Sequence, residues 1–306
     1  MHGVGISRPA FLGGPALAPP GAAEVAADVA AALAEDVGAG DVTAQLLPEA
    51  LRVRGHIITR EDAVLCGTAW VEATFRHLDP EIRLKWHAQD GAAVSAGQTL
   101  LQIEGAARAL LSAERTALNF LQTLSGTATA ASRFAAAVRG TGCMILDTRK
   151  TVPGLRRAQK YAVRCGGAHN HRMGLFEMFL IKENHIAAAG SLAAAVAAAR
   201  HHSGHLAVEV EVESLQELER ALDAEPDVIM LDDFTAADLI EAVARNRARP
   251  RPVKLEASGG ISLENVRQVA QSGVDFISIG ALTKHVHAID LSLRIDLVEL
   301  GGRGSS

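Results

Sequence analysis

Short apolar runs alternate with segments of helical period through the second half of the chain. The apolar runs are CMILD, EMFLIK, HLAVEVEVE, DVIMLDD, PVKLEASGG and DFISIGA. Between them lie SLAAAVAAARHH, SLQELERALD, TAADLIEAVARN and SLENVRQVAQSG, whose apolar residues recur every three or four positions. A strand followed by a helix, repeated in this way, predicts a parallel sheet closed into an α/β barrel.

Hydroxyl residues stand where these helices are expected to begin. A side-chain oxygen at such a position accepts a backbone N–H of the first helical turn. Ser214 with Glu217 three residues later also has the spacing of a capping box. The predicted N-caps are Ser191, Ser214, Thr235 and Ser262.

The first half of the chain has a different pattern. Helical spacing over residues 25–35 gives way, between Leu51 and Gly105, to short strands separated by Gly and Asp turns. The piece DGAAVSAGQTLLQIEG resembles the half-repeat of biotinyl and lipoyl carrier domains, but no lysine stands at a hairpin tip. We therefore expect a structural, hammerhead-like sandwich. The stretch LLSAERTALNFLQTLSGTATAASRFAAAV then predicts a long helix connecting two domains.

Composition narrows the range of partners. The formal net charge is -5, so the chain as a whole does not attract polyanions, and nucleic acid is not an expected partner. No apolar run approaches the length that spans a bilayer, so no membrane partner is expected. The three cysteines are widely spaced and odd in number, which indicates no disulfide framework and fits a cytoplasmic protein.

The ends of the predicted strands carry polar residues and glycines. In a barrel of parallel strands, these carboxyl ends meet on one face, where barrel enzymes place their chemistry. The sequence therefore predicts one active site formed by all of these ends. They are Asp147 to Lys150, Lys182, Glu211, Asp232, Ser258 with two glycines, and Gly280.

Cations are concentrated between Arg149 and Lys182, where eight Lys and Arg residues face a single acid, Glu177. Four of them fall on one predicted helix and are expected to form its solvated face. Arg149, Lys150, Arg172 and Lys182 instead lie at strand ends or in glycine-rich loops. Several cations directed into one pocket indicate a substrate with several negative charges. The four helix residues are Arg156, Arg157, Lys160 and Arg164.

Two glycine-containing turns follow the last two predicted strands, SGG at 258–260 and IGA at 279–281. Glycine lets backbone N–H groups approach an anion, and barrels often bind phosphate at this pair of turns, although glycine there can also serve the turn alone.

Glu209, Glu211 and Glu213 alternate along one strand and share a face. That face is either solvated or directed into the site. Glu211 with Asp232 on the next strand suits ribose hydroxyls and Mg²⁺, a hard ion that prefers oxygen ligands.

The stretch CGGAHNHRMG, residues 165–174, poses a choice between a metal site and an anion site. His-x-His is a common zinc fragment, but no third ligand follows at a plausible spacing. The neighbouring DTRK and IKENH supply cations, which favour an anion. We expect His171 and Arg172 to contact that anion, and His169 to be a structural strand-end residue.

Long motifs of this chain resemble the quinolinate phosphoribosyltransferase family in order and spacing. The motifs are AERTALNFLQTLSGTAT, LDTRKTVPGLRRAQKYAV, GGAHNHRMGL, IKENH, VEVEVES, IMLDDF, LEASGGI and SIGALTK. The resemblance implies an N-terminal α/β sandwich, an incomplete (open) α/β barrel and a homodimer whose active site is shared between subunits. Whether dimers assemble further stays open. The expected divisions are a flexible arm over 1–21, the sandwich over 22–128 joined by a C-terminal helix over 288–301, and the barrel over 129–287.

The resemblance also implies a reaction and a set of residue roles. Quinolinate and phosphoribosyl pyrophosphate would give nicotinate mononucleotide, pyrophosphate and CO₂, with Mg²⁺ as cofactor. The catalytic group would be Lys150, Lys182, Glu211 and Asp232, which also contact phosphoribosyl pyrophosphate. Glu211 and Asp232 would help to hold Mg²⁺, directly or through water. Quinolinate would contact Arg115 of the other subunit, Thr148, Arg149, His171 and Arg172. The 5′-phosphate would contact Ser258, Gly259, Gly260, Ile279, Gly280 and Ala281.

Three other interpretations are open at this point. A barrel lyase would use Lys182 or Lys254 as a Schiff-base amine. A barrel paralogue in molybdenum metabolism would share the architecture with altered substrate contacts, against which the intact HNHR and DTRK motifs count. A carrier-like binding module would need the modifiable lysine that the hairpin lacks.

Overall fold

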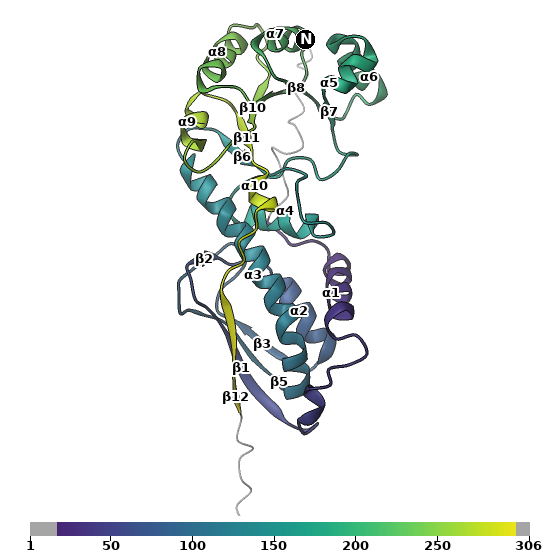
Figure 1. Ribbon diagram of the computed structural model, residues 1–306, viewed down its shortest axis with the longest axis vertical. Coiled ribbons are helices and arrows are strands. Elements are labelled where there is room, and N and C mark those ends of the chain that lie inside the picture. Colours follow the sequence, from purple (N-terminus) through teal and green to yellow (C-terminus); the bar gives the residue numbers. More distant parts are fainter. Residues whose placement is uncertain (1–16, 298–306) are drawn as a thin grey trace, which may run out of the picture. The chain divides into compact units, whose positions relative to one another are not determined.

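The computed structural model describes residues 17–297 of the 306-residue chain (Figure 1). The expected flexible arm over 1–21 thus lies almost entirely outside the described residues. The described chain divides into two compact units. Of the described residues, the N-terminal unit comprises 17–130, 152–167 and 285–297, and the barrel unit comprises 131–151 and 168–284.

The N-terminal unit is built on an antiparallel sheet in the order β12-β1-β5-β3. In β1, Val53, Gly55, Ile57 and Thr59 are buried and the residues that alternate with them are more exposed, because successive side chains of a strand point to opposite faces. One face of the sheet therefore turns toward the core. The strands are β1 (Arg52–Thr59), β3 (Arg83–Trp86), β5 (Thr99–Ala106) and β12 (Leu291–Leu297), with β2 (Ala63–Val64) paired to β4 (Ala93–Val94).

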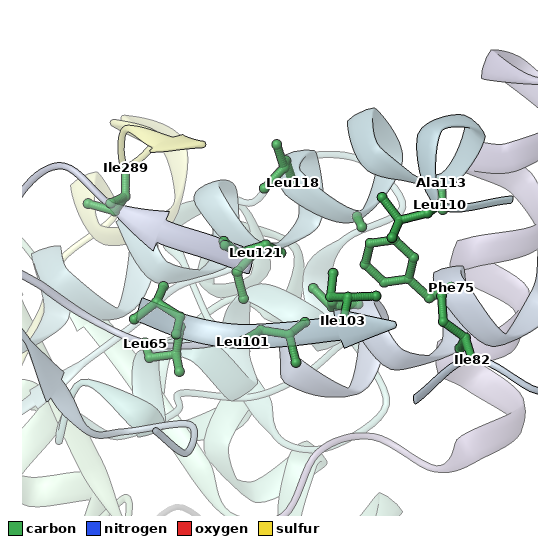
Figure 2. Close-up of a cluster of buried hydrophobic side chains, with 14 of the residues drawn as sticks. Leu65, Phe75, Ile82, Leu101, Ile103, Leu110, Ala113, Leu118, Leu121 and Ile289 are labelled. Atoms are coloured by element: carbon green, nitrogen blue, oxygen red, sulfur yellow. The ribbon is translucent and has the colours of Figure 1, made fainter. Parts of the chain in front are cut away.

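Two helices supply the other half of this core. In Figure 2, Phe75 of α2 and Leu110 and Leu121 of α3 lie over Leu101 and Ile103 of β5. All five side chains are almost fully buried. The core is apolar and continuous, as the predicted sandwich requires. The helices of the unit are α1 (Ala22–Asp36), the short 3-10 helix η2 (Ala44–Leu46), α2 (Thr68–Leu78), α3 (Ala107–Ala137) and α4 (Arg156–Cys165).

The C-terminal segment joins this sheet as a strand, so the helix expected over 288–301 is wrong. Residues 291–297 form β12, which pairs antiparallel with β1 from Thr59–Leu291 to Val53–Leu297. The sequence LSLRIDL alternates apolar and polar residues with the period of a strand. Leu291, Leu293 and Ile295 accordingly pack against the apolar core.

Helix α4 packs in the N-terminal unit, although its sequence lies within the stretch expected for the barrel. Its Ala158 and Tyr161 belong to an apolar cluster with Val29 of α1 and Trp70 of α2. The rings of Trp70 and Tyr161 are 6.0 Å apart, centroid to centroid. Lys160, expected on a solvated helix face, is only 1% exposed. The basic residues of α4 are therefore not one solvated stripe.

The barrel unit is a parallel sheet in the order β6-β11-β10-β9-β8-β7. Among the described residues, β6 and β7 form the two edges and are not paired with each other, which confirms the incomplete barrel. His169 adds a single parallel bridge to Leu146 of β6. The strands are β6 (Met144–Leu146), β7 (Phe179–Ile181), β8 (Val208–Val212), β9 (Val228–Asp232), β10 (Lys254–Ser258) and β11 (Phe276–Ser278).

Helices separate these strands along the chain, and three of the four predicted N-caps are confirmed. The side-chain oxygens of Ser191, Ser214 and Thr235 each accept the expected backbone N–H at 3.1–3.2 Å. Ser262 does not cap a helix, because α9 begins at Val266 with Asn265 as its N-cap. The helices are α5 (Glu183–Ala189), α6 (Leu192–His202), α7 (Leu215–Ala224), α8 (Ala236–Arg247), α9 (Val266–Gln271) and α10 (Ala281–Lys284). No helix within residues 17–297 is long and apolar enough to cross a membrane.

Candidate active site

The interior of the barrel unit changes in character along its strands. Leu146, Val228 and Phe276 form a buried apolar cluster from three strands. At the level of Phe276 in the strand register lie Glu256 on β10, which is fully buried, and Glu211 on β8, which is partly buried. Alternate residues of a strand share a face, so the apolar cluster and the acids occupy the same interior. Acidic side chains thus stand beside apolar ones in the interior that leads to the carboxyl edge of the sheet.

The predicted strand-end residues do gather at this carboxyl edge. Lys182 follows β7, Glu211 lies near the end of β8, and Asp232 and Ser258 end β9 and β10, where they pair in register. Lys182 Nζ contacts Glu211 Oε2 in an ion pair, with Glu211 mostly buried and Lys182 partly exposed. This pair leaves a cation and a carboxylate at one point on the edge.

The loop after β6 and the turn after β11 lie against each other. Thr148 Oγ1 accepts the backbone N–H of Lys150 at 3.0 Å, and Thr283 Oγ1 donates to the Lys150 carbonyl at 2.8 Å. A Cβ added at Gly280 would come within 2.9 Å of Lys150 Cδ and 3.5 Å of Thr148 Oγ1. The glycine therefore allows the DTRK loop to approach the IGA turn, as two halves of one anion site must.

The SGG turn is equally constrained. Gly259 has φ +87°, and a Cβ there would lie 1.9 Å from Asp233 Oδ1. The Asp233 backbone N–H donates to the Ser258 carbonyl at 3.0 Å, and Asp233 itself has φ +55°. Only glycine fits both this backbone conformation and this close approach. The turn is thus built with exposed backbone beside an acid-bearing loop.

The two histidines of CGGAHNHRMG lie in different environments. His169 is exposed, and its backbone bonds to Ile145 and Asp147 extend β6, which confirms the structural strand-end role. His171 is 7% exposed, with Nε2 2.9 Å from Glu209 Oε2 and 3.6 Å from Glu256 Oε2. In the described chain the potential metal-binding group at this point joins His171 to two glutamates and not to His169, so the His-x-His zinc fragment is not assembled.

The backbone around His171 is held as well. Its N–H donates to Asp147 Oδ1 at 2.9 Å, and Asn170 Nδ2 donates to Asp147 Oδ2 at 2.6 Å. The next N–H, that of Arg172, donates to His171 Nδ1 at 2.7 Å. Both ring nitrogens of His171 are therefore engaged within the protein, which sequence reasoning did not foresee.

Burial shifts the ionisation of this region. Loss of solvent raises the pKa of Glu209 to about 8, against a lowering influence of Arg172. Loss of solvent and the adjacent Glu209 raise the pKa of Glu256 to about 8. Burial also lowers the pKa of Arg172, and the nearby charge of Arg149 lowers it further. Two guanidinium groups held close enough to repel each other are well placed to receive an anion.

The carboxylates toward the edge could hold a cation. Glu211, Glu213 and Asp232 each offer an oxygen atom, and these atoms lie within 4.8 Å of one another. Oxygen ligands in such a group suit Mg²⁺. The alternating stripe on β8 thus divides by burial: Glu209 is buried, Glu211 is partly buried and Glu213 is exposed.

The remaining predicted residues lie partly at this carboxyl edge and partly elsewhere. Arg149 lies in the loop after β6 and Ile279 accompanies Gly280 and Ala281 after β11, and Ile279 N–H donates to the Leu146 carbonyl at 2.9 Å. Arg115 is an exposed residue of α3 in the N-terminal unit, so the cluster within the barrel unit does not include it. Lys254 begins β10 at the opposite end of the strand and pairs with Asp275 at 2.6 Å, which removes it as a Schiff-base amine of this site.

Sequence reasoning named neither Glu209 nor Glu256 as a site residue. A signal existed for both, since Glu209 belongs to the stripe on β8 and Glu256 is the one acid in LEAS. Such an acid inside an apolar strand is costly to bury unless a partner compensates it.

Cations, two carboxylates and paired glycine turns at the carboxyl edge of an open parallel barrel define an enzyme that binds a phosphorylated, multiply anionic substrate. Residues 41–125 match the family described as quinolinate phosphoribosyl transferase, N-terminal domain, and residues 127–294 match its C-terminal domain. This chain therefore belongs to the quinolinate phosphoribosyl transferase family, which is a family of decarboxylating pentosyltransferases.

Individual relatives agree with this assignment. The chain is 45% identical over 269 residues to nicotinate-nucleotide pyrophosphorylase (carboxylating) of Mycobacterium leprae, covering 86% of this chain and 94% of that protein. It is 39% identical over 264 residues to a probable enzyme of the same name in Bacillus subtilis, covering 86% and 90%. The solved structure of nicotinate-nucleotide pyrophosphorylase from Francisella tularensis matches with a TM-score of 0.89 at 44% identity, over 93% of this chain and 100% of that one.

Proposed function

We propose that this chain transfers the phosphoribosyl group of phosphoribosyl pyrophosphate to quinolinate, with loss of CO₂, to give nicotinate mononucleotide and pyrophosphate. The observation that carries the proposal is the carboxyl edge of the open barrel, where the Lys182–Glu211 ion pair and the register pair Asp232–Ser258 lie at the ends of neighbouring strands. Membership of the family supplies the identity of the substrates.

Quinolinate binds to the cationic side of the edge. Arg149 and Arg172 hold its two carboxylates, and Thr148 in the same loop contributes a hydroxyl. His171 contacts this subsite through Arg172, whose backbone N–H it accepts. Arg115, exposed on α3, completes the subsite from the partner subunit of a homodimer.

Phosphoribosyl pyrophosphate binds along the rest of the edge. Lys150 and Lys182 contact the pyrophosphate, and Glu211 and Asp232 accept hydrogen bonds from the ribose hydroxyls. The two glycine turns bind the 5′-phosphate through backbone N–H groups, as helix starts and turns do for anions. The residues of this cradle are Ser258, Gly259, Gly260, Ile279, Gly280 and Ala281.

Positioning and electrostatics drive the reaction. The pyridine nitrogen attacks ribose C1 as pyrophosphate leaves, and positive charge grows on the ribose ring. Glu211, mostly buried beside Lys182, stabilises that charge. The ring nitrogen is then cationic, and loss of the adjacent carboxylate as CO₂ leaves a carbanion next to N⁺ that a proton quenches.

Mg²⁺ is the proposed cofactor, with Glu211 and Asp232 as its protein ligands, directly or through water. The grouped carboxylate oxygens of Glu211, Glu213 and Asp232 fit a hard cation. When bound, the ion would offset the negative charge of the leaving pyrophosphate. Lys182 contacts Glu211 on the other side, so this carboxylate can serve both the cation and the lysine.

The test is direct. Full-length protein is incubated with quinolinate, phosphoribosyl pyrophosphate and Mg²⁺, and nicotinate mononucleotide is measured by chromatography and mass. Product should appear at a one-to-one ratio with CO₂, and chelation should stop the reaction until Mg²⁺ is returned. Nicotinic acid, which lacks the second carboxylate, should be a poor substitute. Efficient use of nicotinic acid, or borohydride trapping of a carbonyl substrate on Lys182, would overturn this proposal.

The shared site of the homodimer has its own test. Arg115→Ala and Arg172→Ala are each purified inactive, then mixed and allowed to exchange subunits. If the site is shared, random assortment makes half of the dimers mixed, each with one complete site, and about a quarter of the wild-type activity returns. Mixtures that stay inactive despite proven exchange would place Arg115 and Arg172 in the same subunit's site. Sedimentation gives the state of assembly.

We also propose that the protein acts in the cytoplasm without a nucleic-acid partner. The net charge of -5 and three free, buried cysteines support this. Fractionation of the source cells with an antibody is the measurement.

A further inference from the structure

We propose that Glu209 is a positioning residue for the quinolinate subsite, because it holds the His171 ring and thereby fixes the turn that presents Arg172. The inference rests on the proposed function, since the substrate contact of Arg172 is assigned there. Glu209 touches no substrate: its hydrogen bond acts through the histidine, and its charge also acts directly on Arg172.

The ring of His171 bridges Glu209 and the backbone of Arg172. Nδ1 accepts the Arg172 N–H at 2.7 Å, so this nitrogen carries no proton. A neutral ring with a bare Nδ1 has its proton on Nε2, and Nε2 lies 2.9 Å from Glu209 Oε2. The ring therefore donates to Glu209 and accepts from Arg172, and each bond selects the tautomer that the other needs.

Because Glu209 and His171 are both buried, the hydrogen bond between them cannot be replaced by one to solvent. Glu209 is 0% exposed and His171 7%, so neither can exchange the bond for one to bulk water. The Asp147 carboxylate fixes the backbone from the other side by accepting the His171 N–H at 2.9 Å. With residue 171 held at both ring and backbone, the direction of the chain at Arg172 is set.

Arg172 gains a defined direction from this turn. Its Nη1 donates to the Met178 carbonyl at 3.2 Å, which fixes the guanidinium across the loop. The position is costly, because the guanidinium is partly buried and faces the charge of Arg149. A cation held in such a place needs a rigid support, and the bridge from Glu209 supplies it.

Glu256 provides a matched control within the same interior. It is also 0% exposed and also faces His171, but its Oε2 lies 3.6 Å from Nε2, beyond hydrogen-bond distance. If buried negative charge near His171 were what mattered, the two glutamates would be equivalent. If the hydrogen bond to His171 matters, loss of the Glu209 side chain has the larger effect, and Glu256 contributes only through its interaction with Glu209.

The kinetic experiment compares Glu209→Met, Glu209→Gln and Glu256→Met in the full-length enzyme. Methionine keeps the length of the side chain but removes the acceptor, and the KM for quinolinate should rise by about tenfold or more. The KM for phosphoribosyl pyrophosphate should stay within about twofold, because its contacts lie elsewhere on the edge. Glu209→Gln retains an acceptor oxygen and should restore most of the quinolinate KM. Glu256→Met should leave that KM within about threefold.

A second measurement uses the wild-type enzyme, so its result does not depend on whether the variants fold. With ¹⁵N-labelled histidine, the His171 signals, assigned by their loss in His171→Gln, should show a bare Nδ1 and a protonated Nε2. A proton on Nδ1 in the free enzyme overturns the proposal. So does a folded Glu209→Met enzyme with an unchanged quinolinate KM, or an equal effect of Glu256→Met.

Failure of the proposed function has a different signature. It would appear as wild-type protein that makes no nicotinate mononucleotide while His171 still shows the expected tautomer. In that case the bridge stands as a structural feature and the role in quinolinate binding falls.

Discussion

The two units of this molecule fill their interiors in different ways. In the N-terminal unit, Phe75, Leu101 and Leu110 pack in a continuous apolar core between a sheet and two helices (Figure 2). In the barrel unit, a small apolar cluster gives way to Glu209 and Glu256, which are just as buried. Burial of the apolar side chains of Figure 2 stabilises the folded state, whereas burial of the two carboxyl groups in the barrel unit is unfavourable in itself.

The difference shows where stability and chemistry are located. A buried acid is retained in an interior when something else depends on it, and here it is the histidine that leads to Arg172. The apolar side chains in the core of the N-terminal unit have no comparable role in positioning a site residue. We therefore expect mutations in the two interiors to separate into effects on unfolding and effects on substrate binding.

The largest expected effect is on stability, from Phe75→Ala in the N-terminal unit. Phe75 is 0% exposed at the centre of the apolar core. Truncation leaves a cavity and should lower the free energy of unfolding by about 3–5 kcal/mol. Denaturant unfolding measures this, and Phe75→Leu, which fills most of the volume, should lose much less. An unchanged midpoint for Phe75→Ala would mean that this core is not the stabilising one.

Arg172→Ala in the barrel unit should show the opposite profile. Loss of a charge-assisted contact to a carboxylate should lower kcat/KM for quinolinate by about a hundredfold or more, which corresponds to about 2.7 kcal/mol of binding. The unfolding midpoint should stay near that of the wild type, because burial and the charge of Arg149 disfavour the guanidinium ion and offset the attraction of Glu209. Arg83→Ala, an exposed arginine of β3, is the charge-matched control and should leave both unchanged. Wild-type kcat/KM in Arg172→Ala would remove this residue from the site.

Sequence patterns predicted the barrel well because its signals are local. The alternation of apolar runs with helical segments gave six parallel strands, and the side chains of Ser191, Ser214 and Thr235 cap their helices as expected. The polar strand ends also converge as predicted, since parallel strands bring their carboxyl ends to one edge.

The predictions that were wrong concern segments whose place in the fold depends on tertiary packing. Residues 291–297 were expected in a helix, yet their apolar period of two pairs them with β1, far away in the sequence. Helix α4 was expected to belong to the barrel, but Tyr161 packs on Trp70 in the N-terminal unit. Neither partner can be read from the segment itself.

The candidate site shows the same limit at the level of single residues. The contact of His171 with the substrate stays a prediction, but the pattern HNHR does not reveal that Glu209 and the Arg172 backbone contact both ring nitrogens. That arrangement depends on residues from β8 and from the loop after β6, which only the folded barrel brings together. Arg115, in turn, depends on a partner subunit and stays a prediction.

A smaller expected effect is the pH dependence of the free energy of unfolding that arises from Glu256 in the barrel unit. The folded-state pKa of Glu256 is raised to about 8 by burial and by Glu209, with His171 and Ser278 acting in the opposite sense. Between about pH 4.5 and pH 8 the folded protein retains a proton that the unfolded chain has lost, so this group makes stability fall as pH rises, with a limit of about 1.4 kcal/mol per pH unit.

Glu256→Gln removes this titration and should become progressively more stable than the wild type from pH 5.5 to pH 7.5. Denaturant unfolding at several pH values measures the difference, and exposed Glu213→Gln serves as the control with no such trend. Parallel curves for Glu256→Gln and the wild type would show that Glu256 is ionised throughout.

The smallest expected effect concerns the outer surface of the barrel unit and tests whether this unit's stability can be changed without touching its interior. Ser214 Oγ accepts the Glu217 N–H at 3.2 Å at the start of α7. Ser214→Ala leaves that N–H without its cap and should lower the free energy of unfolding by about 1 kcal/mol, while Ser214→Asn keeps an acceptor and should lose little. The KM for both substrates should be unchanged in either variant, because the Ser214 side chain caps α7 and is not among the residues assigned to the site. A cap variant that altered the quinolinate KM would show that the barrel's helices and its site are coupled, and the separation between stability and binding would then hold only for the N-terminal unit.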